Sequence, residues 1–211
     1  MTRITRATLA EAAAELGQID PDFARLVEAH GLPGLRSRPT GFGTLLKVIA
    51  AQQVSTYAAR AITRRLDAVA KPMTPDIFIR LSDAELRAIG FSGQKVSYGR
   101  GIATAVLDGR FSFRRVALMD DEAAIMELVT LKGVGRWTAE IYLLFALRRP
   151  DMWPVDDLGI ALGYAALKRL KRPPDRKRLL AAGEIYRPWR SVAAHLLWHY
   201  LHAVRDGRKV A

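Results

Sequence analysis

The stretch Leu131–Glu140, LKGVGRWTAE, places Gly133 and Gly135 one residue apart, directly ahead of a segment with the pattern of a helix. Glycine adopts positive φ without strain and lets another backbone come close, so the pair predicts a tight turn between two helices. The amide N–H groups that start the second helix have no intrahelical partners, and the positive end of the helix dipole lies beside them. Such a turn is a site for an anion, and a DNA phosphate would fit it. For this short motif alone, a helix–helix turn that binds nothing stays open as the alternative.

The composition favours a polyanionic partner. The 211 residues carry a formal net charge of +12 and include no cysteine. This charge attracts phosphates of any nucleotide sequence, which favours a nucleic acid, although charge that serves solubility alone would look the same. The absence of cysteine excludes a disulfide framework, a thiolate zinc site and a cysteine-ligated iron–sulfur cluster.

The residue pattern predicts an all-α protein of about ten helices, because no stretch alternates polar and apolar residues for long enough to form a strand. Residues 44–66 form one helical pattern with a break near Ser55, and residues 136–148 form a strongly apolar helix that we expect to be central and buried. Other helix boundaries are marked by Asp20-Pro21, Gly31, Thr74-Pro75, the capping box Ser82–Glu85, Gly90, Ser92, Gly109, Asp120 and Pro188.

The chain shows no targeting or membrane segment. Charged residues interrupt the N-terminal thirty positions, so no signal peptide is expected. No apolar run approaches the roughly 20 residues that are needed to span a bilayer. We therefore expect a cytoplasmic protein without membrane contact.

Four motifs in order carry a resemblance to a known family. They are AQQVS (Ala51–Ser55), LKGVGRWTA (Leu131–Ala139), PVDDLG (Pro154–Gly159) and PWRSVAAHLLW (Pro188–Trp198). The sequence resembles the helix-hairpin-helix DNA glycosylases over roughly residues 40 to 200, and within them it looks most like the alkylpurine branch, the DNA-3-methyladenine glycosylase II family.

The resemblance implies one glycosylase domain over residues 1–211, in which two helical subdomains flank a DNA cleft and no β-rich domain precedes them. It places the hairpin at about residues 121–148 and the loop of the catalytic aspartate at residues 149–160.

The family's catalytic aspartate follows Pro-x, and the resemblance carries this role to Asp156, after Pro154-Val155. Loss of the base builds positive charge on the sugar, and a carboxylate at a helix N-terminus stabilises that charge and orients water. Simple capping of a helix is the alternative for the pair Asp156-Asp157. We expect Asp156 to be the catalyst and Asp157 to be a cap or helper.

The resemblance also assigns aromatic residues to a pocket for the damaged base. Trp198 stands where the family carries a ring that stacks on a flipped, cationic purine, and Trp137 and Tyr142 are expected in the same pocket, with weaker support for Trp189. Core packing is the alternative for both Trp137 and Trp198. Related bifunctional enzymes carry a lysine at the Trp137 position that attacks the sugar, so the resemblance implies base removal without strand cleavage.

For DNA binding, the resemblance assigns the phosphate contacts to the backbone amides of Gly133, Gly135 and Thr138. Gln53, with Gln52 beside it, would enter the duplex and fill the space that the flipped base leaves. A polar pair at a helix end is the alternative for these two glutamines.

Members of the family can hold a monovalent cation, Na⁺ or K⁺, on hairpin carbonyls, and the matching positions are Val129, Leu131 and Val134. No other cofactor is expected. The basic run Lys168–Arg178 is either a solvated face or a contact with the DNA backbone.

A histidine cluster offers a weaker hypothesis of a metal site. His195, His199 and His202 lie at helical spacing, but no further ligand accompanies them in the sequence, so metal binding is not the expected outcome.

The expected function is therefore that of a monomeric, nucleoid-associated DNA glycosylase of base excision repair. It would release alkylated purines such as 3-methyladenine or 7-methylguanine from double-stranded DNA by base flipping and hydrolysis. A glycosylase of the same fold for deaminated bases such as hypoxanthine is one alternative. A non-catalytic helix-hairpin-helix DNA-binding protein, or a helical scaffold with incidental charge, is another.

Overall fold

The computed structural model describes residues 3–205 and 207, and every regular element in this part of the chain is a helix. The described residues contain thirteen α-helices, one π-helical turn and one 3₁₀ turn, which confirms the all-α prediction. They fall into two compact units. One, the hairpin unit, runs from Arg38 to Leu147, and the other, the terminal unit, joins the residues up to Ser37 with those from Arg148 onward.

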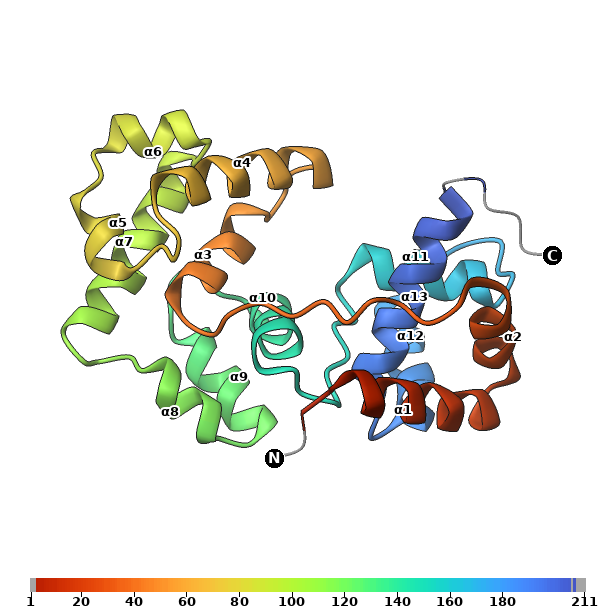
Figure 1. Ribbon diagram of the computed structural model, residues 1–211. Helices are drawn as coiled ribbons and strands as arrows, with labels where there is room; N and C mark the ends of the chain where they lie inside the picture. The colour runs from red at the N-terminus through yellow and green to blue at the C-terminus, as the bar shows by residue number, and fades with distance from the viewer. Residues whose placement is uncertain (1–2, 206, 208–211) are drawn as a thin grey trace. The chain divides into compact units, whose positions relative to one another are not determined.

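The hairpin unit contains α3 to α10 and the π turn η1 (Figure 1). Their bounds are α3 Phe42–Ala50, α4 Thr56–Val69, α5 Pro75–Arg80, α6 Asp83–Ile89, α7 Gly93–Leu107, α8 Phe113–Leu118, α9 Asp121–Val129, α10 Arg136–Tyr142 and η1 Leu143–Leu147. The expected break near Ser55 is confirmed, because the Ser55 side chain caps α4 by accepting a hydrogen bond from the Ala58 amide.

The core of the hairpin unit is apolar, with large side chains that are fully buried. Leu45, Leu46 and Ile49 of α3 and Phe78 of α5 have almost no exposed surface. A side chain at Gly99 would stand 2.6 Å from the Phe78 ring, so the glycine allows α5 and α7 to approach closely.

The terminal unit contains the first two and the last four elements. Their bounds are α1 Arg6–Ile19, α2 Pro21–His30, α11 Leu158–Leu167, α12 Arg176–Gly183, the 3₁₀ turn η2 Glu184–Tyr186 and α13 Arg190–Arg205. The helix α13 packs against α11, α2 and α1 (Figure 1). Every residue from Ser191 to Leu197 is buried, as expected for a helix that is surrounded by others.

Two helix predictions differ from the structure in their bounds. The apolar segment 136–148 is an α-helix only to Tyr142, and it continues as the π turn η1. The last helix begins at Arg190 rather than at Pro188. Short helices such as α8, which has six residues, were not expected, because six residues are too few to display helical periodicity.

A partly buried ionic cluster joins the N-terminal and C-terminal segments of the terminal unit. Lys168 Nζ lies 2.6 Å from Asp20 Oδ1 and 2.7 Å from Asp22 Oδ2, and the Tyr186 hydroxyl donates to Asp20 Oδ2 at 2.7 Å. Burial alone would lower the pKa of Lys168, but the hydrogen bonds to both carboxylates outweigh it and raise that pKa. Lys168, the first residue of the basic run, therefore serves the fold.

Replacing Lys168 with methionine is expected to lower the free energy of unfolding by about 2 kcal/mol, because Asp20 would stay buried without its cation. The matched control is Lys171→Met, which removes an exposed lysine of the same run and should change stability by less than about 0.5 kcal/mol. Urea denaturation of the two variants measures the difference. Equal stability of the two variants would show that the cluster contributes nothing to the free energy of unfolding.

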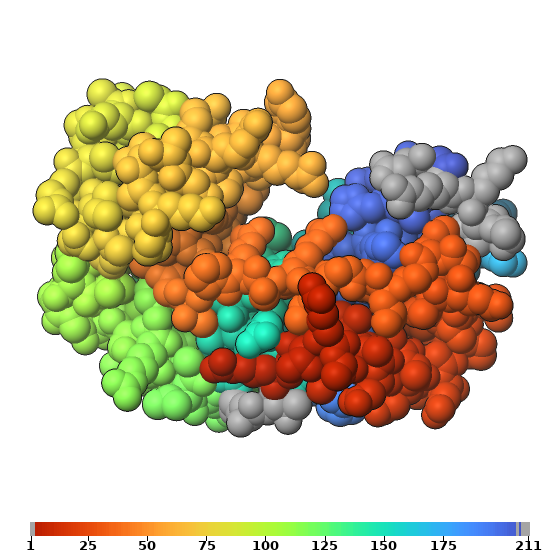
Figure 2. Space-filling view, viewed as in Figure 1, coloured from red at the N-terminus to blue at the C-terminus, as the bar shows by residue number. Residues whose placement is uncertain are grey.

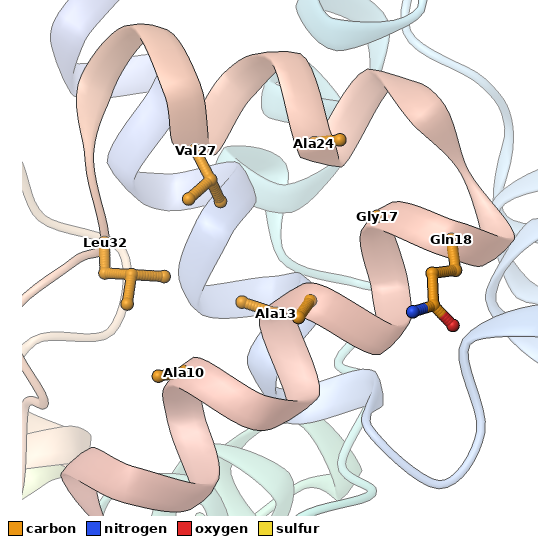
Figure 3. A pocket seen from close by; sticks show the side chains of 8 residues that line it. Ala10, Ala13, Gly17, Gln18, Ala24, Val27 and Leu32 are labelled. Atoms are coloured by element: carbon orange, nitrogen blue, oxygen red, sulfur yellow. The ribbon is translucent and has the colours of Figure 1, made fainter.

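A shallow groove of about 320 Å³ lies between α1 and α2 (Figure 3). Gln18 is the single polar side chain that lines it, among small or apolar residues such as Gly17, Ala24, Val27 and Leu32. It contains none of the residues expected to carry chemistry. Among the described residues, no helix is both long and apolar enough to cross a membrane.

Candidate active site and nucleic-acid interface

The glycine turn joins α9 to α10, as the sequence predicts. Gly133 has a φ of 90°, which strains any other residue, and an added Cβ would stand 2.2 Å from the Tyr98 ring. The buried side chains of Leu131 and Val134 anchor the turn, and the Val134 amide donates to the Leu131 carbonyl at 3.0 Å. The shape of the turn is therefore fixed by packing within the hairpin unit.

Gly135 plays a different part in the turn. It is the N-cap of α10, it has an ordinary φ of −88°, and an added Cβ would meet no atom within 4 Å. No side chain caps this helix. The next residue, Arg136, is held by a two-pronged contact with Glu122 at 2.8 Å, and this hydrogen bonding raises the pKa of Arg136. No atom of the unit occupies the space where a side chain at Gly135 would stand, so a ligand has room to approach the backbone there.

Gln52 braces the turn from the α3 side. Its side-chain amide donates to the Gly133 carbonyl at 3.1 Å and to the Thr138 hydroxyl at 2.9 Å. Lys95 in turn donates from Nζ to the carbonyls of Ala50 and Gln52 at 3.0 and 2.8 Å. The side-chain nitrogen of Gln52 therefore supports the turn, and a DNA contact by this residue stays a prediction.

Gln53, unlike Gln52, is exposed. Its φ is 54°, a left-handed conformation that glutamine rarely adopts. Such outliers persist where the surrounding structure fixes them, and they concentrate at functional sites. The space-filling view shows the orange segment at the start of α4, which directly follows Gln53, standing out from the surface of this unit (Figure 2).

The two aromatic residues predicted on the hairpin side differ in their surroundings. Tyr142 is fully buried, and its hydroxyl accepts a hydrogen bond from the Gly41 amide at 2.8 Å. Burial raises the pKa of Tyr142 to about 12. The prediction that Tyr142 lines a base pocket is therefore corrected: it is a core residue of the hairpin unit. Trp137 is half-buried, so part of its ring is accessible at the start of α10.

The carboxylate at the start of α11 is that of Asp157. Its Oδ1 accepts hydrogen bonds from the Ile160 amide and from the Trp198 indole N–H, both at 3.0 Å. The position is favourable for a negative charge because the N-terminal amides of α11 point toward it. These two donors fix the orientation of the carboxylate.

Two glycines of α11 make this arrangement possible. A Cβ on Gly159 would stand 2.9 Å from both Asp157 Oδ1 and Trp198 Nε1. A Cβ on Gly163 would stand 2.6 Å from the Leu197 carbonyl oxygen. The pair lets α13 approach α11 closely enough for Trp198 to reach Asp157. Gly159 belongs to the PVDDLG motif, but its role was not predicted.

Asp156 has a more open environment. Its side chain is 45% exposed, and its Oδ1 lies 3.0 Å from Nε of Arg176, whose side chain is 58% exposed. Surface pairs of this kind contribute little to stability. The geometry thus separates the two aspartates in a way that differs from the sequence prediction: the carboxylate held at a helix N-terminus against a tryptophan is Asp157.

The remaining predicted aromatic residues lie in the terminal unit. Trp198 is half-buried, and its ring meets the His195 ring edge-on at a centroid distance of 6.0 Å. The Trp189 indole N–H donates to Glu15 of α1 at 2.6 Å, so this side chain ties the end of the chain to its beginning.

The expected cation carbonyls fit only in part. The Leu131 carbonyl already accepts the Val134 amide within the turn. A carbonyl oxygen has two lone pairs, so this bond leaves one lone pair of the Leu131 oxygen for a cation. A cation on the carbonyls of Val129, Leu131 and Val134 stays a prediction.

The histidines of α13 do not assemble a metal site. The described residues contain no group of three histidine, cysteine, aspartate or glutamate side chains that could hold an ion. His199 Nε2 lies 3.0 Å from the His30 carbonyl oxygen, and His195 is only 3% exposed. Burial, with a smaller contribution from Arg36, lowers the pKa of His195 to about 4.

This shift predicts acid sensitivity. Between pH 6.5 and pH 4, the unfolded chain binds a proton at His195 and the folded chain does not, so stability falls as the pH falls through this window. We expect a loss of about 3 kcal/mol from this residue alone. Unfolding measured at several pH values for wild type and His195→Gln tests this, and an equally steep decline in both proteins would contradict it.

Comparison with known proteins identifies the family. The model of the HhH-GPD superfamily of base excision DNA repair proteins matches residues 46–188, which include the hairpin, both aspartates and Gln53. The chain belongs to this family. DNA-3-methyladenine glycosylase 1 of Schizosaccharomyces pombe is 33% identical over 202 residues, which are 90% of this chain and 87% of that protein.

Solved structures of relatives agree with the fold. A 3-methyladenine DNA glycosylase of Schizosaccharomyces pombe in complex with abasic DNA has a TM-score of 0.83 and 33% identity, over 89% of this chain and 95% of that chain. A DNA-3-methyladenine glycosidase from Bacillus halodurans has a TM-score of 0.72 and 31% identity, over 91% of each chain. The fold is thus the HhH-GPD fold, as the four motifs predict.

Proposed function

We propose that the protein is a DNA glycosylase of base excision repair that releases alkylated purines from duplex DNA. The observation that carries the proposal is the Asp157 carboxylate, fixed at the N-terminus of α11 by the Ile160 amide and the Trp198 indole. The similarity to the 3-methyladenine glycosylases of Schizosaccharomyces pombe and Bacillus halodurans supports the substrate class. The net charge of +12 supports a polyanionic partner.

In this proposal, Asp157 stabilises the positive charge that develops on the sugar as the glycosidic bond breaks. A fixed carboxylate does this without reorganisation, because its hydrogen bonds to Ile160 and Trp198 already set its direction. It can also orient the water that attacks the sugar. An alkylated purine carries positive charge and is a good leaving group, so the reaction needs little acid catalysis.

Trp198 is the proposed contact for the damaged base. Its ring is partly exposed, and its N–H is engaged by Asp157, which fixes the plane of the indole. An electron-rich face suits a cationic base through stacking and cation–π attraction. Trp137, at the start of α10, is the second candidate, and its lack of an amine is the basis for proposing base release without strand cleavage.

The hairpin is the proposed anchor for the DNA backbone. The open backbone at Gly135, together with the N-terminal amides of α10 up to that of Thr138, offers donors to a phosphate. A monovalent cation on the carbonyls of Val129, Leu131 and Val134 would add positive charge there. Gln53, exposed in its left-handed conformation, is the proposed residue that enters the duplex.

A panel of duplexes tests the substrate class. Single-turnover assays would compare DNA that contains 7-methylguanine or 3-methyladenine with DNA that contains hypoxanthine, and each product would be examined for strand breaks before and after alkali. The proposal expects alkylated bases to be released and the strand to stay intact until alkali is added. Release of hypoxanthine alone would show that deaminated bases, not alkylated purines, are the substrates. Strand breaks before alkali is added would overturn the proposal that the enzyme only removes the base.

A further inference from the structure

The exposed face of α4 carries a row of three side chains that have no role in the proposed catalytic site or in the hairpin. Tyr57, Arg60 and Arg64 are spaced three and four residues apart, so they lie on one face of the helix. All three are exposed, and Tyr57 is 79% exposed, which is unusual for a tyrosine. We call these three side chains the α4 stripe.

The opposite face of α4 explains why the stripe points outward. Ile62 and Leu66 of the opposite face are buried, and Arg65 donates to the Ile89 carbonyl at 2.7 Å. Asp67, three residues after Arg64 on the side of the stripe, is the only carboxylate in α4, and its charge is paired with Lys47 of α3.

The two arginines of the stripe are not used in the fold. Neither Arg60 nor Arg64 forms an ion pair or hydrogen bond with any residue that the structure describes. Many other arginines of this chain do, including Arg65 on the same helix and Arg136 at the hairpin. A fully solvated face would account for the charges, but not for a bare tyrosine placed beside them at the first turn.

The stripe is also continuous with the segment that carries Gln53. Tyr57 lies four residues after Gln53 and two residues after the Ser55 cap. Gln52 binds this segment to the glycine turn and Lys95 binds it to α7, so the start of α4 has a fixed place relative to the hairpin within one unit. The stripe extends roughly 10 Å along the helix, which corresponds to about three nucleotide steps of one strand.

We propose that the α4 stripe is a second DNA-binding surface, which holds the sugar–phosphate backbone of the duplex next to the point where Gln53 enters. Arg60 and Arg64 contact phosphates, and Tyr57 packs against a sugar or base at the lesion. This inference rests on the proposed function and adds a surface that determines affinity. Chemistry at Asp157 does not depend on it.

The test measures binding and excision separately. Fluorescence anisotropy gives the affinity for a duplex with a tetrahydrofuran abasic analogue between about 50 and 200 mM salt. The double variant R60Q/R64Q is expected to bind about tenfold more weakly at the upper salt concentration and to have a salt slope smaller by about two. Tyr57→Ala should weaken binding about fivefold with an unchanged slope. Single-turnover release by the wild-type protein is measured in parallel, because it tests the proposed function independently of these variants.

The control is Arg114→Gln in α8, which removes one exposed arginine from the same unit. It should leave both affinity and salt slope close to wild type. A wild-type slope in R60Q/R64Q, with base release intact, would overturn the α4 surface and leave the proposed function standing. If wild type releases no base, the proposed function fails, and the slopes still decide whether the α4 stripe binds DNA.

Discussion

Replacing Asp157 with asparagine is expected to lower the single-turnover rate of base release by roughly a hundred- to a thousandfold. Asparagine caps a helix as well as aspartate does, and its side-chain oxygen can accept the same hydrogen bonds from Ile160 and Trp198. The substitution therefore removes the charge while it keeps the contacts. DNA affinity and the melting temperature should stay near those of wild type.

Asp156→Asn is the matched control, since it changes the neighbouring residue in the same way. Asp156 is half exposed and, among the described residues, pairs with Arg176 at the surface, so we expect less than about a threefold change in rate. The opposite ranking, with Asp156→Asn inactive and Asp157→Asn active, would restore the assignment that the sequence alone predicts.

The two glycines of the turn should respond to alanine in different ways. Gly133→Ala is expected to lower the free energy of unfolding by about 3 kcal/mol, because the residue has a φ of 90° and its methyl group would collide with the Tyr98 ring. Gly135→Ala should leave stability within about 0.5 kcal/mol of wild type, because its φ is ordinary and the space beside it is open.

For DNA affinity, in contrast to stability, the informative substitution is Gly135→Ala. Gly135→Ala is expected to weaken DNA binding about tenfold, because the methyl group would occupy the side from which a phosphate approaches the amides. Urea denaturation and anisotropy on the same samples separate the two effects. A Gly135→Ala protein that is stable and binds DNA as wild type does would show that the turn is structural only.

The sequence was sufficient for features whose cause is local. A glycine pair between two helical patterns needs no tertiary knowledge to predict a turn, and Ser55 and the Ser82 capping box mark helix starts by their own chemistry. The order of the motifs along the chain then predicted the family, and the match of the HhH-GPD family model to residues 46–188 confirms it.

Features that depend on tertiary contacts were not accessible in the same way. Asp156 and Asp157 are adjacent and identical in type, and the contact of Asp157 with Trp198, 41 residues away, could not be read from the sequence. Gln52 reaches the turn across 81 residues, so its inward orientation left no local signal. Tyr142 is buried because α10 is covered from Thr138 to Tyr142, and an aromatic residue in an apolar helix fits a core and a pocket equally well.

Chromatographic detection of free bases released from methylated duplex DNA by the wild-type protein is the most direct test of the proposed glycosylase activity. We expect release of 3-methyladenine or 7-methylguanine, with abasic strands that stay intact until alkali is added. Absence of any released base, from protein that is folded and binds the same DNA in a salt-dependent way, would contradict it and favour a non-catalytic DNA-binding protein of this fold.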